Sequence, residues 1–355
     1  MLFRSSPFFP RQAYHIDRVA PEVASINRGS PTAQRVSETE VTFAVTFDEA
    51  VDGVAAGSFS LVKTGTISGE TITDVSGADD TWTVTVTVDA IPCMGTLALR
   101  LNQNLDLITD AVGNPMETEF TTGQTYIIDR QPPEVLSIVR HIPSAEKTNA
   151  ARVKYAVTFN ESVSGVAEDC FRATGTGSLS GVSIVDVTGV DEAWIVEVET
   201  LAGDGQLTIV LDQNLSNVVD SVGNAMETAS GVSEAYRIDH IPPAVSSIQF
   251  SSPLVAETNA AQVTFLVLFT DIDGVTNVLP NNFTIDATGG QVGASVMSVT
   301  PLGALPAAAW FVQVATVNGG VGTLSIDLNQ NLSAITDDVG NPMAEPYTTG
   351  PYYTI

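Results

Sequence analysis

Hydrophobic and polar residues alternate with a period of two along many short segments of this chain. The clearest segment, 81–88, reads Thr-Trp-Thr-Val-Thr-Val-Thr-Val and is rich in residues that favour β-strands. Clusters of Gly, Asp, Asn and Ser separate such segments and supply turns. In the first third of the chain the pattern predicts strands near 22–28, 38–48, 57–63, 67–76, 80–89, 95–103 and 123–128. No segment has a sustained helical period, so we expect an all-β protein.

The same succession of segments occurs three times, at a spacing of about 110 residues. Each copy opens on an aspartate followed by one or two prolines, carries a tryptophan at the start of an alternating segment, and later has an Asp-x-Val-Gly-Asn turn. These landmarks are Asp17–Pro21, Asp129–Pro133 and Asp239–Pro243; Trp82, Trp194 and Trp310; and Asp110–Asn114, Asp220–Asn224 and Asp337–Asn341. Matches of this length exclude coincidence, so the chain is a tandem repeat.

A repeat of this size with short antiparallel strands predicts two packed sheets with Greek-key connections, which is an immunoglobulin-like β-sandwich. We expect its core to include Phe43, Phe47, Phe59, Trp82 and Leu99. Short proline-containing linkers predict three tandem sandwiches in an extended, semi-rigid rod. The predicted divisions are an N-terminal arm at 1–16 and modules at 17–128, 129–238 and 239–355.

Three motifs in this order resemble the bacterial immunoglobulin-like repeats of large adhesins and phage structural proteins. They are Asp-x-x-Pro-Pro, Val-Thr-Phe-x-Glu-x-Val-x-Gly-Val and Asp-x-x-Gly-Asn-x-Met, and the resemblance covers residues 17–355. The third copy departs from it, with Thr270-Asp271 where the first two have Asp48-Glu49 and Asn160-Glu161. The resemblance implies the module and leaves its task open, because such repeats serve as stalks, spacers, adhesive units and decorations.

The chain is strongly acidic, with 14 Lys and Arg against 41 Asp and Glu and a net charge of −27. This charge disfavours binding to nucleic acid and to anionic membranes. No hydrophobic run is long enough for membrane insertion, and the first ten residues lack the pattern of a secretion signal. Solubility is the simplest interpretation of the charge. The alternative is that some carboxylates hold a hard cation such as Ca²⁺.

Alternate loops of a seven-stranded sandwich lie at the same end, so carboxylates from separate segments should meet at the start of each module. The predicted Ca²⁺ ligands are Asp17, Asp48, Glu49, Asp110 and Asn114; Asp129, Glu161, Asp220 and Asn224; and Asp239, Asp271, Asp273, Asp337 and Asn341. The alternative is that Asp-x-x-Gly-Asn is only a turn, in which Asp caps backbone amides and Gly or Asn adopts a positive φ.

The arm at 1–16 lies outside the repeat, except that Ala13-Tyr-His-Ile16 resembles the last strand of a module. It is locally basic and aromatic, so we predict that it anchors the chain to a protein partner, either by adding a strand to a sheet edge or by placing Phe and Arg on an acidic surface. The predicted anchoring residues are Phe3, Arg4, Phe8, Phe9, Arg11 and Tyr14. A flexible tail is the alternative.

The sequence contains no recognisable catalytic motif. His15, His141 and His240 do not recur across the copies, and Cys93 and Cys170 occupy non-equivalent positions, which favours two unpaired thiols over a disulfide. We therefore expect a structural protein and not an enzyme.

The main interpretation is a decoration or fibre component on the surface of a phage-like virion or another large assembly, anchored by its arm to capsid, tail or filament subunits. The alternative is an extracellular stalk or ligand-binding segment of a bacterial surface adhesin that contacts a host-surface protein or glycan. A third class is a carbohydrate-binding accessory module.

Overall fold

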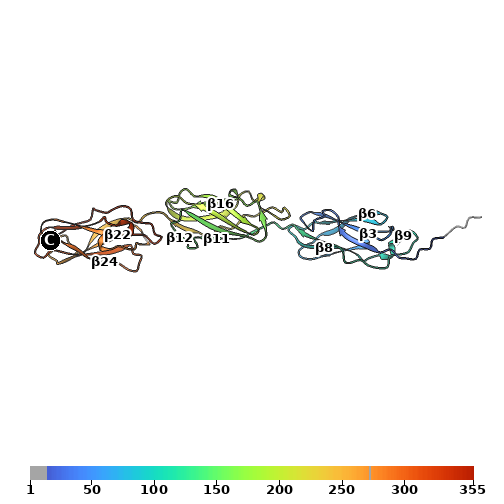
Figure 1. The fold of residues 1–355 in the computed structure, drawn as a ribbon, viewed down its shortest axis with the longest axis horizontal. Coiled ribbons are helices and arrows are strands. Elements are labelled where there is room, and N and C mark those ends of the chain that lie inside the picture. Colours follow the sequence, from blue (N-terminus) through green and yellow to red (C-terminus); the bar gives the residue numbers. More distant parts are fainter. Residues whose placement is uncertain (1–13, 272) are drawn as a thin grey trace, which may run out of the picture. The chain divides into compact units, whose positions relative to one another are not determined.

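The computed structural model describes residues 14–271 and 273–355. Every regular element in these ranges is a β-strand or a short 3₁₀ turn (Figure 1). Contacts between residues divide the chain into two compact units. The first runs to residue 134 and also includes 161–165 and 215–227, and the second comprises 135–160, 166–214 and 228–355. In the described ranges, no helix has the length and apolar character that a membrane span requires.

The first repeat forms two four-stranded sheets, as its alternating pattern predicts. One sheet has the order β1 (Val23–Arg28), β3 (Glu40–Phe47), β7 (Thr81–Val88) and β6 (Glu70–Ala78). The other has the order β2 (Arg35–Val36), β10 (Thr125–Asp129), β8 (Met94–Leu101) and β5 (Phe59–Lys63). Neighbouring strands are antiparallel except β2 and β10, which are parallel. Because the chain crosses between the sheets in Greek-key fashion, the all-β, immunoglobulin-like prediction is confirmed.

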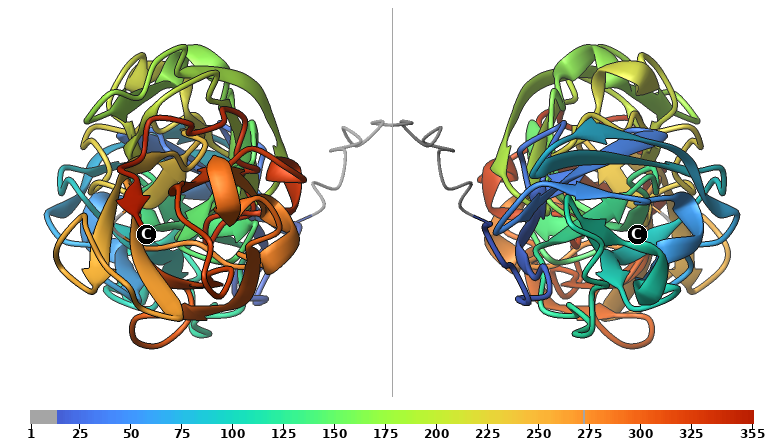
Figure 2. Two further views of the ribbon diagram at one scale, coloured as in Figure 1. Left: turned by 90° about the vertical axis from the view of Figure 1, so that its left-hand side faces the viewer. Right: turned by 90° about the vertical axis from the view of Figure 1, so that its right-hand side faces the viewer.

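The second repeat has the same strand order, and the third has it except that an isolated bridge between Glu257 and Thr354 stands in place of the β2 pairing. In the second, the sheets are β11 (Val135–Ile142), β13 (Arg152–Phe159), β17 (Ala193–Glu199) and β16 (Ser183–Val190), and β12 (Lys147–Thr148), β20 (Tyr236–Asp239), β18 (Asp204–Leu211) and β15 (Phe171–Gly175). In the third, they are β21 (Val245–Ser252), β22 (Gln262–Phe269), β25 (Ala309–Ala315) and β24 (Ser295–Pro301), and β23 (Phe283–Ala287), β26 (Thr323–Leu328) and β27 (Tyr353–Thr354). Figure 2 shows the strands of this last repeat, coloured orange to red, in end-on views. The predicted module boundaries and the rod-like arrangement stay predictions.

Short elements connect the long strands. Two-residue pairs join β4 (Val51–Asp52) to β9 (Thr109–Asp110) and β14 (Val163–Ser164) to β19 (Val219–Asp220). The 3₁₀ turns are Ala56–Ser58, Leu105–Leu107, Glu168–Cys170, Leu215–Asn217, Pro280–Asn282, Gly289–Gln291 and Leu332–Ala334. These short elements lack a period that a sequence pattern could reveal, and they fix the loops at the end of the sandwich where the acidic residues lie.

The inward-facing residues of both sheets form the core of the first repeat. Phe43, Phe47, Phe59 and Leu99 are buried as predicted, but Trp82 is only partly buried. Trp82 stands near the start of β7, where its indole Nε1 donates to the Asp79 carbonyl at 3.3 Å, so the ring covers the edge of the core instead of filling it. Both cysteines are buried, and no disulfide joins them.

A buried tyrosine in each closing strand ties the two sheets together. The hydroxyl of Tyr126 lies 2.7 Å from the Pro31 carbonyl oxygen and 2.9 Å from that of Thr42, and its ring packs edge-on against Phe43. Tyr236 and Tyr353 make the equivalent pairs of contacts in the second and third repeats. Because the phenol places its polar tip on backbone carbonyls, it can be buried without losing hydrogen bonds.

Candidate cation-binding clusters

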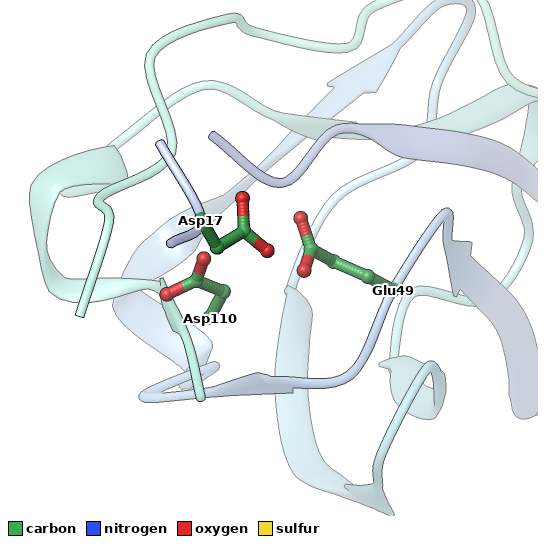
Figure 3. A group of neighbouring side chains, drawn as sticks. All are labelled: Asp17, Glu49 and Asp110. Carbon is green, nitrogen blue, oxygen red and sulfur yellow. The ribbon is translucent and has the colours of Figure 1, made fainter. Parts of the chain in front are cut away.

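In the part of the chain that the structure describes, carboxylates gather into three clusters, one for each repeat. In each cluster, one oxygen from every member lies within 4.8 Å of the others. The clusters are Asp17, Glu49 and Asp110; Asp129, Glu161 and Asp220; and Asp239, Asp271 and Asp337. In the first, the three carboxylates point toward one another from three separate segments (Figure 3). The loops that sequence reasoning placed at one end of each sandwich therefore do converge, and Asp271 fills the position that Glu49 and Glu161 occupy.

The short strand pairs explain why these segments meet. Val51 pairs with Asp110, which holds the loop that carries Glu49 beside the Asp-x-Val-Gly-Asn turn. Gly53 follows this pair with φ of +86°, and a Cβ there would lie 1.9 Å from the Leu107 carbonyl oxygen. Only glycine fits such a close approach of two backbones. The Val-x-Gly-Val motif in the sequence therefore marks the contact that builds the cluster.

The turn interpretation of Asp-x-x-Gly-Asn also describes part of the arrangement. Asp110 Oδ1 accepts the backbone N–H groups of Val112 at 3.0 Å and Asn114 at 2.8 Å, and its Oδ2 accepts the Asn114 side-chain N–H at 2.7 Å. Burial alone would raise the pKa of Asp110, but the bonds from Asn114 and Val112 outweigh it and lower the pKa. The turn thus holds one carboxylate ionised and fixed while it faces the other two.

The other predicted ligands lie beside the clusters, where they form hydrogen bonds or ion pairs. Asn224 and Asn341 donate their side-chain N–H to Asp220 and Asp337, as Asn114 does to Asp110, and also to the carbonyls of Asp129 and Asp239. These asparagines orient the aspartates. Asp48 accepts the Glu22 backbone N–H at 2.8 Å, and Asp273 forms an ion pair with Lys147 at 2.6 Å.

Burial, together with crowding of like charges, raises the pKa of at least one carboxyl in each cluster. Burial, followed by the charges of Asp129 and Asp220, raises the pKa of Glu161 to about 7. Burial is also the largest cause of the raised pKa values of Glu49 and Asp271, with neighbouring aspartates adding to it. A carboxyl whose charge is disfavoured in this way gains from a bound proton or a bound cation. Carboxylates on loops suit Ca²⁺, which accepts oxygen ligands in irregular geometry, so the residues present fit this ion.

Sequence reasoning missed two basic residues beside the clusters. Arg35, the first residue of β2, forms an ion pair with Asp129 at 2.7 Å. Lys147, at the same position of β12, pairs with Asp273 at 2.6 Å and approaches Asp239 at 3.6 Å. Alignment of the repeats places Arg35, Lys147 and Glu257 at one position, and this was the available signal. Among the described residues, no basic side chain forms an ion pair with the first cluster.

A cavity of about 590 Å³ opens beside the third cluster. Its lining includes Lys147, Arg237, Asp239, Asp271 and Asp273, so charges of both signs face the same space. An ion can therefore approach these carboxylates through solvent, against the competition of two basic side chains. The predicted anchoring residues Phe3, Arg4, Phe8, Phe9 and Arg11 lie outside the described residues. Tyr14 is described, and 87% of its surface is exposed.

No family model matches this chain, and no curated protein matches it. Solved structures with similarity to it include FdeC, an adhesin of Escherichia coli, at 15% identity and a TM-score of 0.38 over 95% of this chain and 99% of that one. Invasin, a bacterial integrin-binding protein, is 12% identical with a TM-score of 0.28 over 87% of this chain and 57% of its own. The N-terminal part of the bacterial S-layer protein SbsC is 15% identical with a TM-score of 0.21 over 63% of this chain and 44% of its own. Similarities at this level assign no family.

Proposed function

We propose that this chain is a non-enzymatic spacer segment of a bacterial cell-surface adhesin, and that Ca²⁺ bound at the three acidic clusters stiffens it. The observation that carries the proposal is the recurrence of the same carboxylate cluster at the start of each repeat. A single cluster is easily explained as a solvated turn. Recurrence at equivalent positions, with Asp271 replacing glutamate in the third copy, favours a common role for all three.

The position of the clusters supports a mechanical role. Asp129 and Asp239 are the last residues of closing strands β10 and β20, while their cluster partners belong to the loops of the following repeat. A cation shared by these carboxylates would tie the linker to the repeat that it enters. Asn224 already donates to the Asp129 carbonyl at 3.0 Å, so an ion would reinforce an existing connection. Restricting a short proline-containing linker in this way limits bending between successive repeats.

The adhesin interpretation takes precedence over the virion interpretation because it requires fewer features of the chain. Virion decoration also requires an arm that anchors the chain to capsid, tail or filament subunits. A surface spacer requires only the repeats, their linkers and the clusters. Contact with a host-surface protein or glycan belongs to the same proposal, as a task of the assembled adhesin.

Small-angle X-ray scattering of the full chain tests the proposal. We expect Ca²⁺ to increase the radius of gyration and the maximum dimension, and we expect chelator to reverse both changes. The variant Glu49→Gln, Glu161→Gln, Asp271→Asn should not respond to Ca²⁺. A control with the same change of charge, Asp89→Asn, Asp186→Asn, Glu345→Gln, alters exposed acids outside the clusters and should respond like the unaltered chain. Identical scattering of the unaltered chain in Ca²⁺ and in chelator would refute the stiffening role.

A further inference from the structure

The described residues contain more closing-strand segments than sandwiches for them to close. Residues 125–129, 236–239 and 353–354 are the closing strands of the three repeats. The segment Tyr14-His-Ile-Asp17 has the same sequence pattern as Tyr126-Ile-Ile-Asp129 and Tyr236-Arg-Ile-Asp239. It is therefore a fourth copy of a closing strand, and the three described sandwiches already have their own.

The environment of the fourth copy differs sharply from that of the other three. Tyr126, Tyr236 and Tyr353 are fully buried, with their hydroxyls on backbone carbonyls. Tyr14 and Ile16 are 87% and 77% exposed. The side chains that anchor every other closing strand thus lie in solvent here, and removing such apolar surface from water is favourable.

The local turn after the fourth copy matches the turn after an engaged closing strand. Asp17 Oδ1 accepts the Val19 backbone N–H at 3.0 Å. Asp129 and Asp239 accept the N–H two residues ahead in the same way, at 3.3 and 3.1 Å. Asp17 also joins the first acidic cluster, as Asp129 and Asp239 join the second and third. The segment therefore connects to the first repeat as a closing strand connects to the repeat that follows it.

We propose that residues 14–17 are the closing strand of a further immunoglobulin-like sandwich, one that lacks its own last strand and lies outside the three described here. The segment would pair antiparallel with the strand of that sandwich that corresponds to β8, as β10 pairs with β8, and would bury Tyr14 and Ile16 between its sheets. Backbone hydrogen bonds between the two strands would supply affinity for the partner, and burial of Tyr14 between the partner's sheets would supply selectivity.

The acidic clusters specify one further property of the partner. Arg35 and Lys147, each beside a closing strand, contact the acids at the start of the following repeat. The first cluster has no such basic partner among the described residues, so the acceptor sandwich should carry Lys or Arg at this position. A second copy of this chain fits poorly, because its third repeat keeps β27 and has Glu257 there, bridged to Thr354.

An acceptor made from the full chain tests the proposal directly. Deletion of residues 351–355 opens the third sandwich, Glu257→Lys supplies the basic residue, and Tyr14→Asp with Ile16→Asp prevents the acceptor from donating. Sedimentation should show a 1:1 complex with the unaltered chain. A donor with Tyr14→Asp and Ile16→Asp should not bind, whereas a donor with Val19→Asp, which alters an exposed residue beyond the strand, should bind normally. Retaining Glu257 in the acceptor should weaken binding by about tenfold.

The test remains valid if the acceptor, which lacks residues 351–355, does not fold by itself. Refolding that requires the unaltered donor supports the proposal, and failure to refold or bind with that donor contradicts it.

Ile127→His provides a second test in the intact chain, because it turns the closing strand of the first repeat into the sequence Tyr-His-Ile-Asp. Ile127 is partly exposed and its counterpart Arg237 is exposed, so the melting temperature should stay within a few degrees of the unaltered value. A loss as large as that caused by Tyr126→Asp would show that this sequence cannot close a sandwich. Neither test depends on Ca²⁺, so this inference and the proposed function can fail separately.

Discussion

At the scale of single residues, one carboxylate of the first acidic cluster both holds a turn and faces its neighbours. Asp110 holds its own turn through hydrogen bonds and still presents its carboxylate to Asp17 and Glu49. The sequence supported a turn and a cation site as alternatives, and the geometry makes them compatible. The ion pairs of Arg35 and Lys147 could not be predicted with equal ease, because they depend on the parallel pairing of two-residue strands.

Glu161 should give the cation-free protein an unusual dependence on pH. Its pKa is about 7 in the folded state against 4.5 in an unconstrained chain, so the folded state binds its proton more tightly than the unfolded state. The contribution of this group to stability is therefore fully present below about pH 4.5 and is lost as the pH rises toward 7. Denaturant unfolding in chelator from pH 4.5 to 8 should show this decline.

Glu161→Gln should remove that part of the decline, whereas Glu168→Gln, an exposed residue of the same repeat, should leave it in place. An identical pH profile for Glu161→Gln and the unaltered chain would mean that Glu161 does not hold the proton.

The tyrosine hydroxyls can be tested by removing a single atom. Tyr126→Phe leaves the ring in place but removes the hydroxyl that contacts the carbonyls of Pro31 and Thr42, of which the Thr42 carbonyl still accepts the Gly29 N–H. The free energy of unfolding of the first repeat should therefore fall by about 1 kcal/mol. Tyr14→Phe, at an exposed position, should change it by less than about 0.5 kcal/mol. Equal effects of the two substitutions in chemical denaturation would contradict the bonding role of Tyr126.

At the scale of elements, the sequence predicted the long strands and missed the short ones. Every predicted strand of the first repeat is present within a few residues, because alternation over five or more positions leaves a strong signal. β2, β4 and β9 have two residues each and no detectable period. Trp82 was misplaced in the core for a related reason, since alternation identifies the inward face but not how close a residue stands to the end of its sheet.

The close approach at Gly53 can be separated from the need for a positive φ. Gly53 and Gly113 have φ of +86° and +93°, so alanine is strained at both and should cost about 1 kcal/mol from conformation alone. A Cβ at Gly53 also collides with the Leu107 carbonyl, whereas nothing lies within 4 Å of one at Gly113. Gly53→Ala should therefore reduce the free energy of unfolding by about 3 kcal/mol in total. Similar losses for the two variants would disprove the tight backbone contact beside the cluster.

At the scale of the whole molecule, the net charge of −27 makes the crowding of carboxylates in the clusters unfavourable. High net charge keeps a repeat protein soluble but makes its parts repel one another. Cations at the clusters would remove repulsion where carboxylates are most crowded. The repeat itself and the convergence of its acidic loops were predictable from the sequence, because both follow from one strand order applied three times. The likeness of residues 14–17 to a closing strand was visible in the sequence, whereas the exposure of Tyr14 and Ile16 needed the structure.

Calcium should raise the melting temperature of the full chain. At a hundredfold excess over the dissociation constant, each site adds about 2.7 kcal/mol to the stability of the structure that binds it. Scanning calorimetry should show transitions that move upward in Ca²⁺ and downward in chelator, whereas Mg²⁺, which demands a stricter geometry, should shift them less. Transition temperatures that are the same in Ca²⁺, in Mg²⁺ and in chelator would show that cations at the clusters do not stabilise the chain.

The most direct test of the account is a calorimetric titration of Ca²⁺ into the chelator-treated full chain. The account predicts saturable binding to the three clusters, with proton release near pH 7 from the second, and no binding by the Glu49→Gln, Glu161→Gln, Asp271→Asn variant. Absence of binding heat across buffers of different ionisation enthalpy, or equal binding by that variant, would contradict it.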